Sequence, residues 1–161
     1  MICYNCGCRL SEQDFCTGCG ADVSLYKKVM YLSNRLYNDG LDKASVRDLS
    51  GAIASLKESI KLNKNNIDAR NLLGLVYFEM GEAVSALGEW VISQNLRPKK
   101  NIANDYIDMI QNNQARLDGI NQTIKKYNQA LAYCWQDSQD LAVIQLKKVL
   151  SNNPKYVRAH Q

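Results

Sequence analysis

Five of the chain's six cysteines lie within residues 3–19, in the segment CYNCGCRLSEQDFCTGC. Four of them form two C-x-x-C pairs, Cys3 with Cys6 and Cys16 with Cys19, and a glycine follows each pair. A C-x-x-C turn directs two thiolates at one point, and glycine accepts the left-handed backbone that such a turn often requires. Two turns supply the four sulfurs of a closed tetrahedral site, which is the arrangement of structural zinc. The segment is too short to fold by burial alone, so metal binding and folding should be one event.

Other thiol chemistry uses the same residue types. A redox dithiol is one alternative, and an iron–sulfur centre has the same ligand set. Cys8 could replace Cys6 as a ligand, but the matching of the two C-x-x-C pairs favours Cys6, and we expect Cys8 to be a spectator. Cys134 lies in a helical pattern, where we expect a small buried hydrophobe. The segment resembles the short zinc ribbons at the N-termini of many bacterial proteins, and this resemblance implies the metal rather than a function.

The composition is that of an ordinary globular chain, with 46% hydrophobic and 22% charged residues, and the presence of only two prolines favours helix. No run of about 18 apolar residues is present, and Met1 is followed by cysteines and polar residues rather than by a secretory signal. We therefore expect a cytoplasmic chain with no membrane segment. In that reducing compartment a metal site is a better explanation of the cysteines than a disulfide framework.

The segment NLLGLVYFEMGEAVSALGEWVISQNLRP carries the pattern of a helical hairpin. Gly74 and Ala86 are small enough for two antiparallel helices to approach closely, and Trp90 is placed to fill the space between successive hairpins. Gly81 can turn the chain between the helices, and Pro98 can end the second helix. These residues, at these spacings, resemble a tetratricopeptide repeat.

The same pattern recurs elsewhere at a period of about 34 residues. Gly40 and Ala52 take the equivalent places one period earlier, and Ala130, Ala142 and Pro154 take them 56 residues later, which is one period plus 22 residues. We therefore place units at 33–66, 67–100 and 123–156, a helical insertion at 101–122, and the start of a further unit at 157–161.

The predicted fold is all-α: a right-handed α-solenoid of tetratricopeptide-like helix hairpins over residues 23–161, behind a small zinc ribbon over residues 1–22. Apolar residues recur at spacings of three and four through the insertion. It should form a short helix and then a lengthened first helix of the third unit, broken near Asn112 and Asn113. A repeat stack normally closes with a polar capping helix, so the bare last unit suggests a fragment of a longer protein.

No catalytic constellation is visible, since His160 is the only histidine and no phosphate-binding loop or H-E-x-x-H motif occurs. We expect a non-enzymatic protein–protein interaction module, an adaptor or scaffold that binds a peptide or partner helix. The tetratricopeptide resemblance implies that the first helix of each hairpin lines a concave groove. The groove-facing residues that it implies are Tyr37, Asn38, Asn71, Leu72, Phe78, Glu79, Tyr127, Asn128 and Trp135. The alternative for the tyrosines is a place in the core.

Two other functions fit the sequence. The first is a nucleic-acid- or ribosome-associated zinc-ribbon protein, for which the array offers Lys125, Lys126, Lys147 and Lys148. The ribbon itself is net acidic, which argues against direct contact between the ribbon and phosphates. In the second, the ribbon only caps the exposed face of the first hairpin. This role is compatible with an interaction module.

Overall fold

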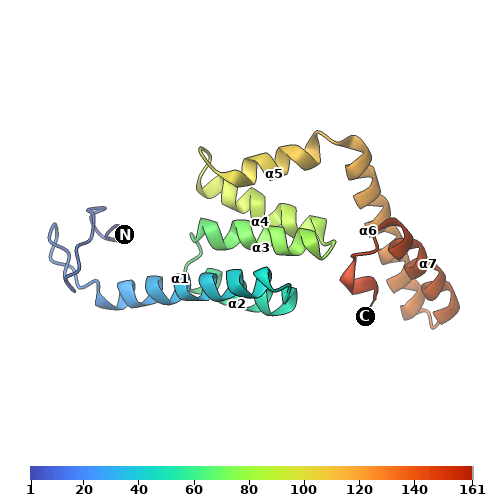
Figure 1. The fold of residues 1–161 in the computed structure, drawn as a ribbon, viewed down its shortest axis with the longest axis horizontal. Coiled ribbons are helices and arrows are strands. Elements are labelled where there is room, and N and C mark those ends of the chain that lie inside the picture. Colours follow the sequence, from blue (N-terminus) through green and yellow to red (C-terminus); the bar gives the residue numbers. More distant parts are fainter. Residues whose placement is uncertain (161) are drawn as a thin grey trace.

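The computed structural model describes residues 1–160, and within them the side chain of every residue except Gln114. Its elements are α1 (Ser24–Ser45), α2 (Leu49–Leu62), α3 (Ile67–Glu79), α4 (Ala83–Leu96), α5 (Ile102–Gln111), α6 (Gln114–Trp135), α7 (Gln139–Asn152) and the 3-10 helix η1 (Val157–Ala159). Helices α1 to α5 form one stack, and α6 and α7 stand beside its end (Figure 1). The predicted all-α fold of tetratricopeptide-like hairpins is confirmed.

Neighbouring helices pair as hairpins, most extensively α1 with α2, α3 with α4 and α6 with α7. Small residues allow this close approach. A Cβ atom at Gly74 would lie 2.2 Å from Nε1 of Trp90, and one at Gly40 would lie 2.7 Å from Cγ of Leu56. Any larger residue would push the helices apart, as the hairpin pattern predicts.

Asparagine is the N-cap residue of three helices, α3, α5 and α6. The side chains of Asn66, Asn101 and Asn113 accept hydrogen bonds from backbone N–H groups in the first turns of α3, α5 and α6. These bonds satisfy donors that a helix start leaves without a partner. Because α5 ends at Gln111 and α6 begins after Asn113, the predicted break near Asn112 and Asn113 is confirmed.

Two apolar clusters hold the stack together. The first includes Ala52, Leu56 and Leu73 and lies between the first two hairpins. The second surrounds Trp90, which is 0% exposed. Its ring packs against those of Phe78 and Tyr106, with centroids 5.9 and 5.0 Å apart respectively. The indole therefore joins α3 and α4 to α5, which is the role that its position in the repeat predicts.

Buried polar side chains also link the helices. The Ser33 hydroxyl donates to the backbone oxygen of Ser59 at 2.9 Å, and Nδ2 of Asn66 donates to Oγ of Ser33 at 3.1 Å. All three side chains are buried. Because each polar group has a partner, this network fixes the register of α1 against α2 without leaving an unpaired group.

The C-terminal segment (residues 153–160) returns to the turn between α3 and α4. The backbone N–H of Val157 donates to the Met80 carbonyl at 3.3 Å, and Nε of Arg158 lies 2.8 Å from Oε1 of Glu82. The third hairpin is therefore attached to the stack at both of its ends, by α5 and by this segment. Of the further unit expected at 157–161, the structure shows η1, and residue 161 lies outside the described residues.

Candidate metal centre and partner-binding surface

The Sγ atoms of Cys3, Cys6, Cys16 and Cys19 lie within 4.8 Å of one another. Two of the separations are 3.8 Å, between Cys3 and Cys19, and 3.5 Å, between Cys6 and Cys16. Four sulfurs at about 2.3 Å from a tetrahedral zinc lie about 3.8 Å apart, so the cluster fits such an ion. All six cysteines are free thiols. The arrangement is therefore one that a thiolate-bound metal ion requires.

The two C-x-x-C turns have the same backbone geometry. Gly7 and Gly20 have φ values of 74° and 72°, the left-handed conformation expected after each pair. The N–H of Gly7 donates to the Cys3 carbonyl at 3.1 Å, and the N–H of Gly20 donates to the Cys16 carbonyl at 2.7 Å. A side chain at either glycine would meet open space, so the backbone conformation is what requires glycine at these positions.

Donors from the turns favour the thiolate form at two of the sulfurs. The backbone N–H of Cys6, and then that of Asn5, lowers the pKa of Cys3. The backbone N–H of Ala21, and then the Asn5 side chain, lowers the pKa of Cys19 to about 6. Asn5 lies 3.4 Å from Sγ of Cys3 through its backbone N and 3.5 Å from Sγ of Cys19 through Nδ2. These N–H groups would also stabilise thiolates that bind a metal ion.

The neighbouring sulfurs oppose ionisation of a third thiol, that of Cys6. The backbone N–H of Cys8 lowers the pKa of Cys6, but the sulfurs of Cys16 and Cys19 raise it, and the net shift is upward. Thiolates this close repel one another, so a cation between them would favour the charged form of all four. The electrostatics of the cluster thus agree with its geometry.

Of the two other cysteines, Cys8 lies where the sequence predicts and Cys134 does not. Cys8 is outside the four-sulfur cluster, and its Sγ lies where a Cβ of Gly18 would approach to 2.7 Å. The expectation of a buried Cys134 is wrong, because this thiol is exposed on α6. Helical periodicity suggested a buried position, but Cys134 is the last residue but one of α6, and its side chain is exposed there.

The cysteine module (residues 1–23) is fixed to the first turns of α1. Nζ of Lys27 donates to the carbonyls of Ser11 and Gln13 at 2.6 and 2.5 Å, and the rings of Tyr4 and Tyr26 meet edge to face at 5.5 Å. These contacts hold the module against α1. It lies beyond the end of α2, at the N-terminal end of α1, rather than over the face of the first hairpin (Figure 1).

The predicted partner-binding residues differ widely in exposure. Trp135 is 85% exposed at the end of α6, whereas Asn71 is 8% exposed in the interior. Asn38, Glu79 and Asn128 are exposed, and Tyr37, Leu72, Phe78 and Tyr127 are partly buried. These residues therefore cannot all contact one bound peptide.

Asn71 is part of a buried polar network rather than a surface. Its Nδ2 donates to Oδ1 of Asn101 at 2.9 Å, and its Oδ1 accepts from the Ser93 hydroxyl at 2.5 Å. Because the residue is also only 8% exposed, the amide is not accessible to a peptide in this conformation. Sequence pattern alone does not predict this position, because an asparagine on a helix has the same sequence signature whether its amide faces solvent or a serine of the next helix.

Two of the predicted residues lie beside the C-terminal segment. Glu79 pairs with Arg47 at 3.1 Å and with Lys155 at 3.4 Å. The hydrogen bond from Arg47, and then the charge of Lys155, holds the pKa of Glu79 below its ordinary value. The Phe78 ring lies under the guanidinium of Arg116, at 4.7 Å. The end of α3 therefore meets α6 and the C-terminal segment through charged and aromatic groups.

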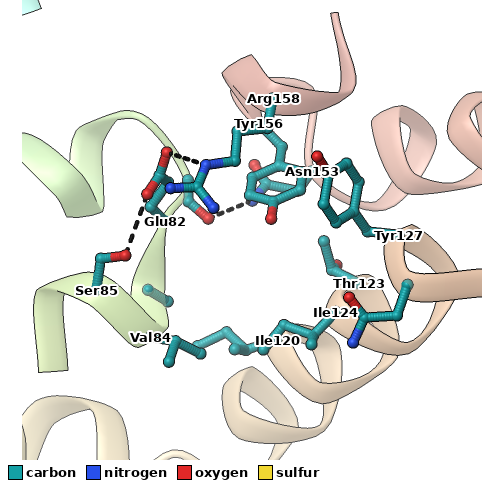
Figure 2. A pocket seen from close by; sticks show the side chains of 13 residues that line it. Glu82, Val84, Ser85, Ile120, Thr123, Ile124, Tyr127, Asn153, Tyr156 and Arg158 are labelled. Atoms are coloured by element: carbon teal, nitrogen blue, oxygen red, sulfur yellow. Dashed lines mark hydrogen bonds and ion pairs between the residues drawn. The ribbon is translucent and has the colours of Figure 1, made fainter. Parts of the chain in front are cut away.

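A cavity of about 220 Å³ lies between the α3–α4 turn, α6 and the C-terminal segment, and Figure 2 shows its lining. Two of the predicted residues, Tyr127 and Asn128, line it. Glu82, Tyr156 and Arg158 line it as well, and sequence reasoning missed them. They come from segments far apart in the chain, and no local sequence pattern predicts that these segments lie side by side.

Comparison with known families supports the repeat. Residues 48–81 match the family model described as a TPR repeat, and a search of the curated proteins finds no match. The matched residues span α2 and α3, and so join the second helix of one predicted hairpin to the first helix of the next. None of the helices in residues 1–160 combines the length and apolarity needed to cross a bilayer. The chain thus carries a tetratricopeptide repeat in an all-helical array, preceded by four clustered cysteines compatible with a zinc ribbon.

Proposed function

We propose that the chain is a non-enzymatic adaptor or scaffold whose helical array binds a peptide or partner helix. The observation that carries the proposal is the TPR match at residues 48–81 within the stack of hairpins formed by α1 to α4. Tetratricopeptide repeats typically mediate protein–protein interactions, and proteins of this family are generally not catalysts. The exposed side chains of Asn38, Asn128 and Trp135 are available for such contacts.

The proposal includes a structural zinc ion held by Cys3, Cys6, Cys16 and Cys19. All four positions of a tetrahedral ion would be filled by protein sulfurs, which leaves no place for a substrate or a reactive water. Its role would be to hold the two C-x-x-C turns together beside α1. Iron has the same ligand chemistry, so metal analysis is the first test: we expect about one zinc per chain and none of the visible absorption that iron bound to thiolates gives.

We also propose a cytoplasmic location, which the same chemistry supports. Free thiols arranged for metal binding are typical of a reducing compartment. We also propose that the array, rather than the cysteine module, makes the principal contacts. The module is net acidic, which argues against nucleic-acid binding by the module. Any phosphate contact would have to come from lysines of the array.

Affinity capture tests the proposal with three forms of the full chain. The wild type should retain a specific protein partner. Cys16→Ser should retain the same partner, because it disrupts only the module. Trp90→Ala should lose the partner, because it opens the stack between α3, α4 and α5. Failure of the wild type to retain any protein, or capture of nucleic acid with an affinity that falls steeply with salt, would contradict the proposal.

A further inference from the structure

The cavity beside the C-terminal segment has an apolar interior. Ile120 and Ile124 of α6 and Val84 of α4 form one side of it, and the rings of Tyr127 and Tyr156 form the other (Figure 2). The two rings meet edge to face, with their centroids 5.3 Å apart. The lining therefore favours an apolar group.

The charged groups at the edge of this cavity are already paired with each other. Glu82 accepts from Arg158 at 2.8 Å and from the Ser85 hydroxyl at 3.1 Å (Figure 2). Nδ2 of Asn153 lies 3.5 Å from the Gly81 carbonyl. The C-terminal segment thus builds one wall of the cavity, and its ion pair needs no partner from a ligand.

The size of the cavity distinguishes between ligand classes. At about 220 Å³ it is smaller than the roughly 300–1,000 Å³ of typical small-molecule sites, but it can take one large amino-acid side chain. It also continues on both sides into open hollows. One hollow, of about 430 Å³, shares Ile120 and Thr123 with the cavity, and another, of about 540 Å³, shares Ile124 and Asn128. A chain crossing α6 could place a side chain in the cavity and its neighbours in the hollows.

Positive charge lies in both hollows. Arg116 and Lys155 line the first, and Lys125 lines the second. Glu79 also lines the first hollow and pairs with Lys155 and with Arg47, so the charge left over among the lining residues of that hollow is the single positive charge of Arg116. The charges on each side of the cavity therefore complement acidic residues on a bound segment.

Resting on the proposed function, we propose that the cavity receives one leucine-sized apolar side chain of a partner peptide, with acidic residues on either side of it. The peptide crosses α6 between Arg116 and Lys125. Such a site uses Tyr127 and Asn128 of the predicted partner-binding set, and it does not use Asn71, Tyr37 or Leu72. The C-terminal segment must stay docked on the α3–α4 turn for the site to exist.

Two capped peptides test this proposal, acetyl-Asp-Asp-Leu-Asp-Asp-amide and the same peptide with alanine in the centre. They are titrated into the full zinc-bound chain, and the isoleucine methyl groups are followed by NMR, which detects weak binding. We expect the leucine peptide to bind at least about tenfold more tightly than the alanine peptide, because three buried carbons are lost. The shifts should be largest at Ile120 and Ile124. Equal binding of both peptides, or shifts concentrated elsewhere, would overturn the proposal, as would equal binding of acetyl-Arg-Arg-Leu-Arg-Arg-amide.

A matched pair of variants locates the effect. Ile124→Ala removes part of the cavity wall and should weaken the leucine peptide about tenfold, whereas Ile144→Ala, at an exposed isoleucine of α7 outside the cavity, should leave binding unchanged. The same pair separates this inference from the proposed function. If Ile124→Ala still captures the partner of the wild type at full strength, the cavity is not the site but the array remains an interaction module. If the wild type captures no partner, the proposed function itself fails.

Discussion

The cysteine module and the helical array are held together by different interactions. The buried residues of the module are Cys3, Cys16 and Val23, and two of these three are proposed metal ligands. The array instead buries continuous clusters around Leu56 and Trp90. Residues that would form a core in a larger domain are sulfur ligands in the module. The contrast indicates that the module depends on its metal ion for folding, whereas the array depends on side-chain packing.

The largest expected effect is on the module and comes from removing one ligand. Cys16→Ser should lower the bound metal from about one ion per chain to none, and the NMR signals of residues 1–23 should move to unfolded positions. The helical circular dichroism should change little, because α1 to α7 lie outside the module. Cys8→Ser and Cys134→Ser are the matched controls and should keep the metal. Loss of metal in Cys8→Ser would mean that the ligand set is wrong.

The corresponding change in the array should leave the metal in place. Trp90→Ala removes the largest fully buried side chain and should lower the free energy of unfolding by about 3–5 kcal/mol. Thermal or urea unfolding measures this loss, and metal analysis should still find about one ion per chain. If the ion were released in this variant, the two regions would not be independent, and the comparison between them would fail.

A pair of asparagines sharpens the description of the array. Asn71→Ala should lower the free energy of unfolding by about 1–3 kcal/mol, because it removes the two hydrogen bonds that this buried amide makes, to Oδ1 of Asn101 and with the Ser93 hydroxyl. Asn38→Ala should change it by less than about 0.5 kcal/mol, because this side chain is exposed. Urea unfolding of both variants makes the comparison. Equal losses in the two variants would contradict the assignment of Asn71 to the interior.

The smallest expected effect is a pH dependence of the C-terminal segment. Because Arg47 and Lys155 lower the pKa of Glu79, the ion pairs are fully formed above the ordinary carboxyl pKa and are lost as the pH falls through the lowered value. The amide shifts of Tyr156 and Val157 should therefore begin to move below about pH 4.5. Glu79 is exposed, so the gain in stability from these pairs is small. The Glu79→Gln variant should lack this titration, and an unchanged titration in it would assign the effect to another carboxyl group.

The sequence was sufficient for the features that depend on local pattern. The helix break at Asn112 and Asn113, the left-handed glycines Gly7 and Gly20, and the close approach at Gly74 all follow from residue type and spacing. The proposed metal ligands could be chosen for the same reason, since a C-x-x-C turn is a local unit. Each of these features involves residues that are near neighbours or lie one hairpin apart.

Features that depend on distant segments could not be predicted in this way. Helical periodicity shows which side of a helix is apolar, but not which element covers it. Asn71 was therefore expected in a groove, although Ser93 and Asn101 enclose it. The pairing of Glu82 with Arg158 joins residues that the pattern gave no reason to connect. The insertion that contains α5 sets the position of the third hairpin, and no repeat rule describes its geometry.

Hydrogen exchange with and without a zinc chelator, read by mass spectrometry at neutral pH, tests the central claim most directly. The account predicts that removing the metal brings residues 1–23 to the exchange rate of an unfolded chain, while α3 and α4 keep their protection. Protection of residues 1–23 that survives removal of the metal would contradict it, and so would a loss of protection that extends through α3 and α4.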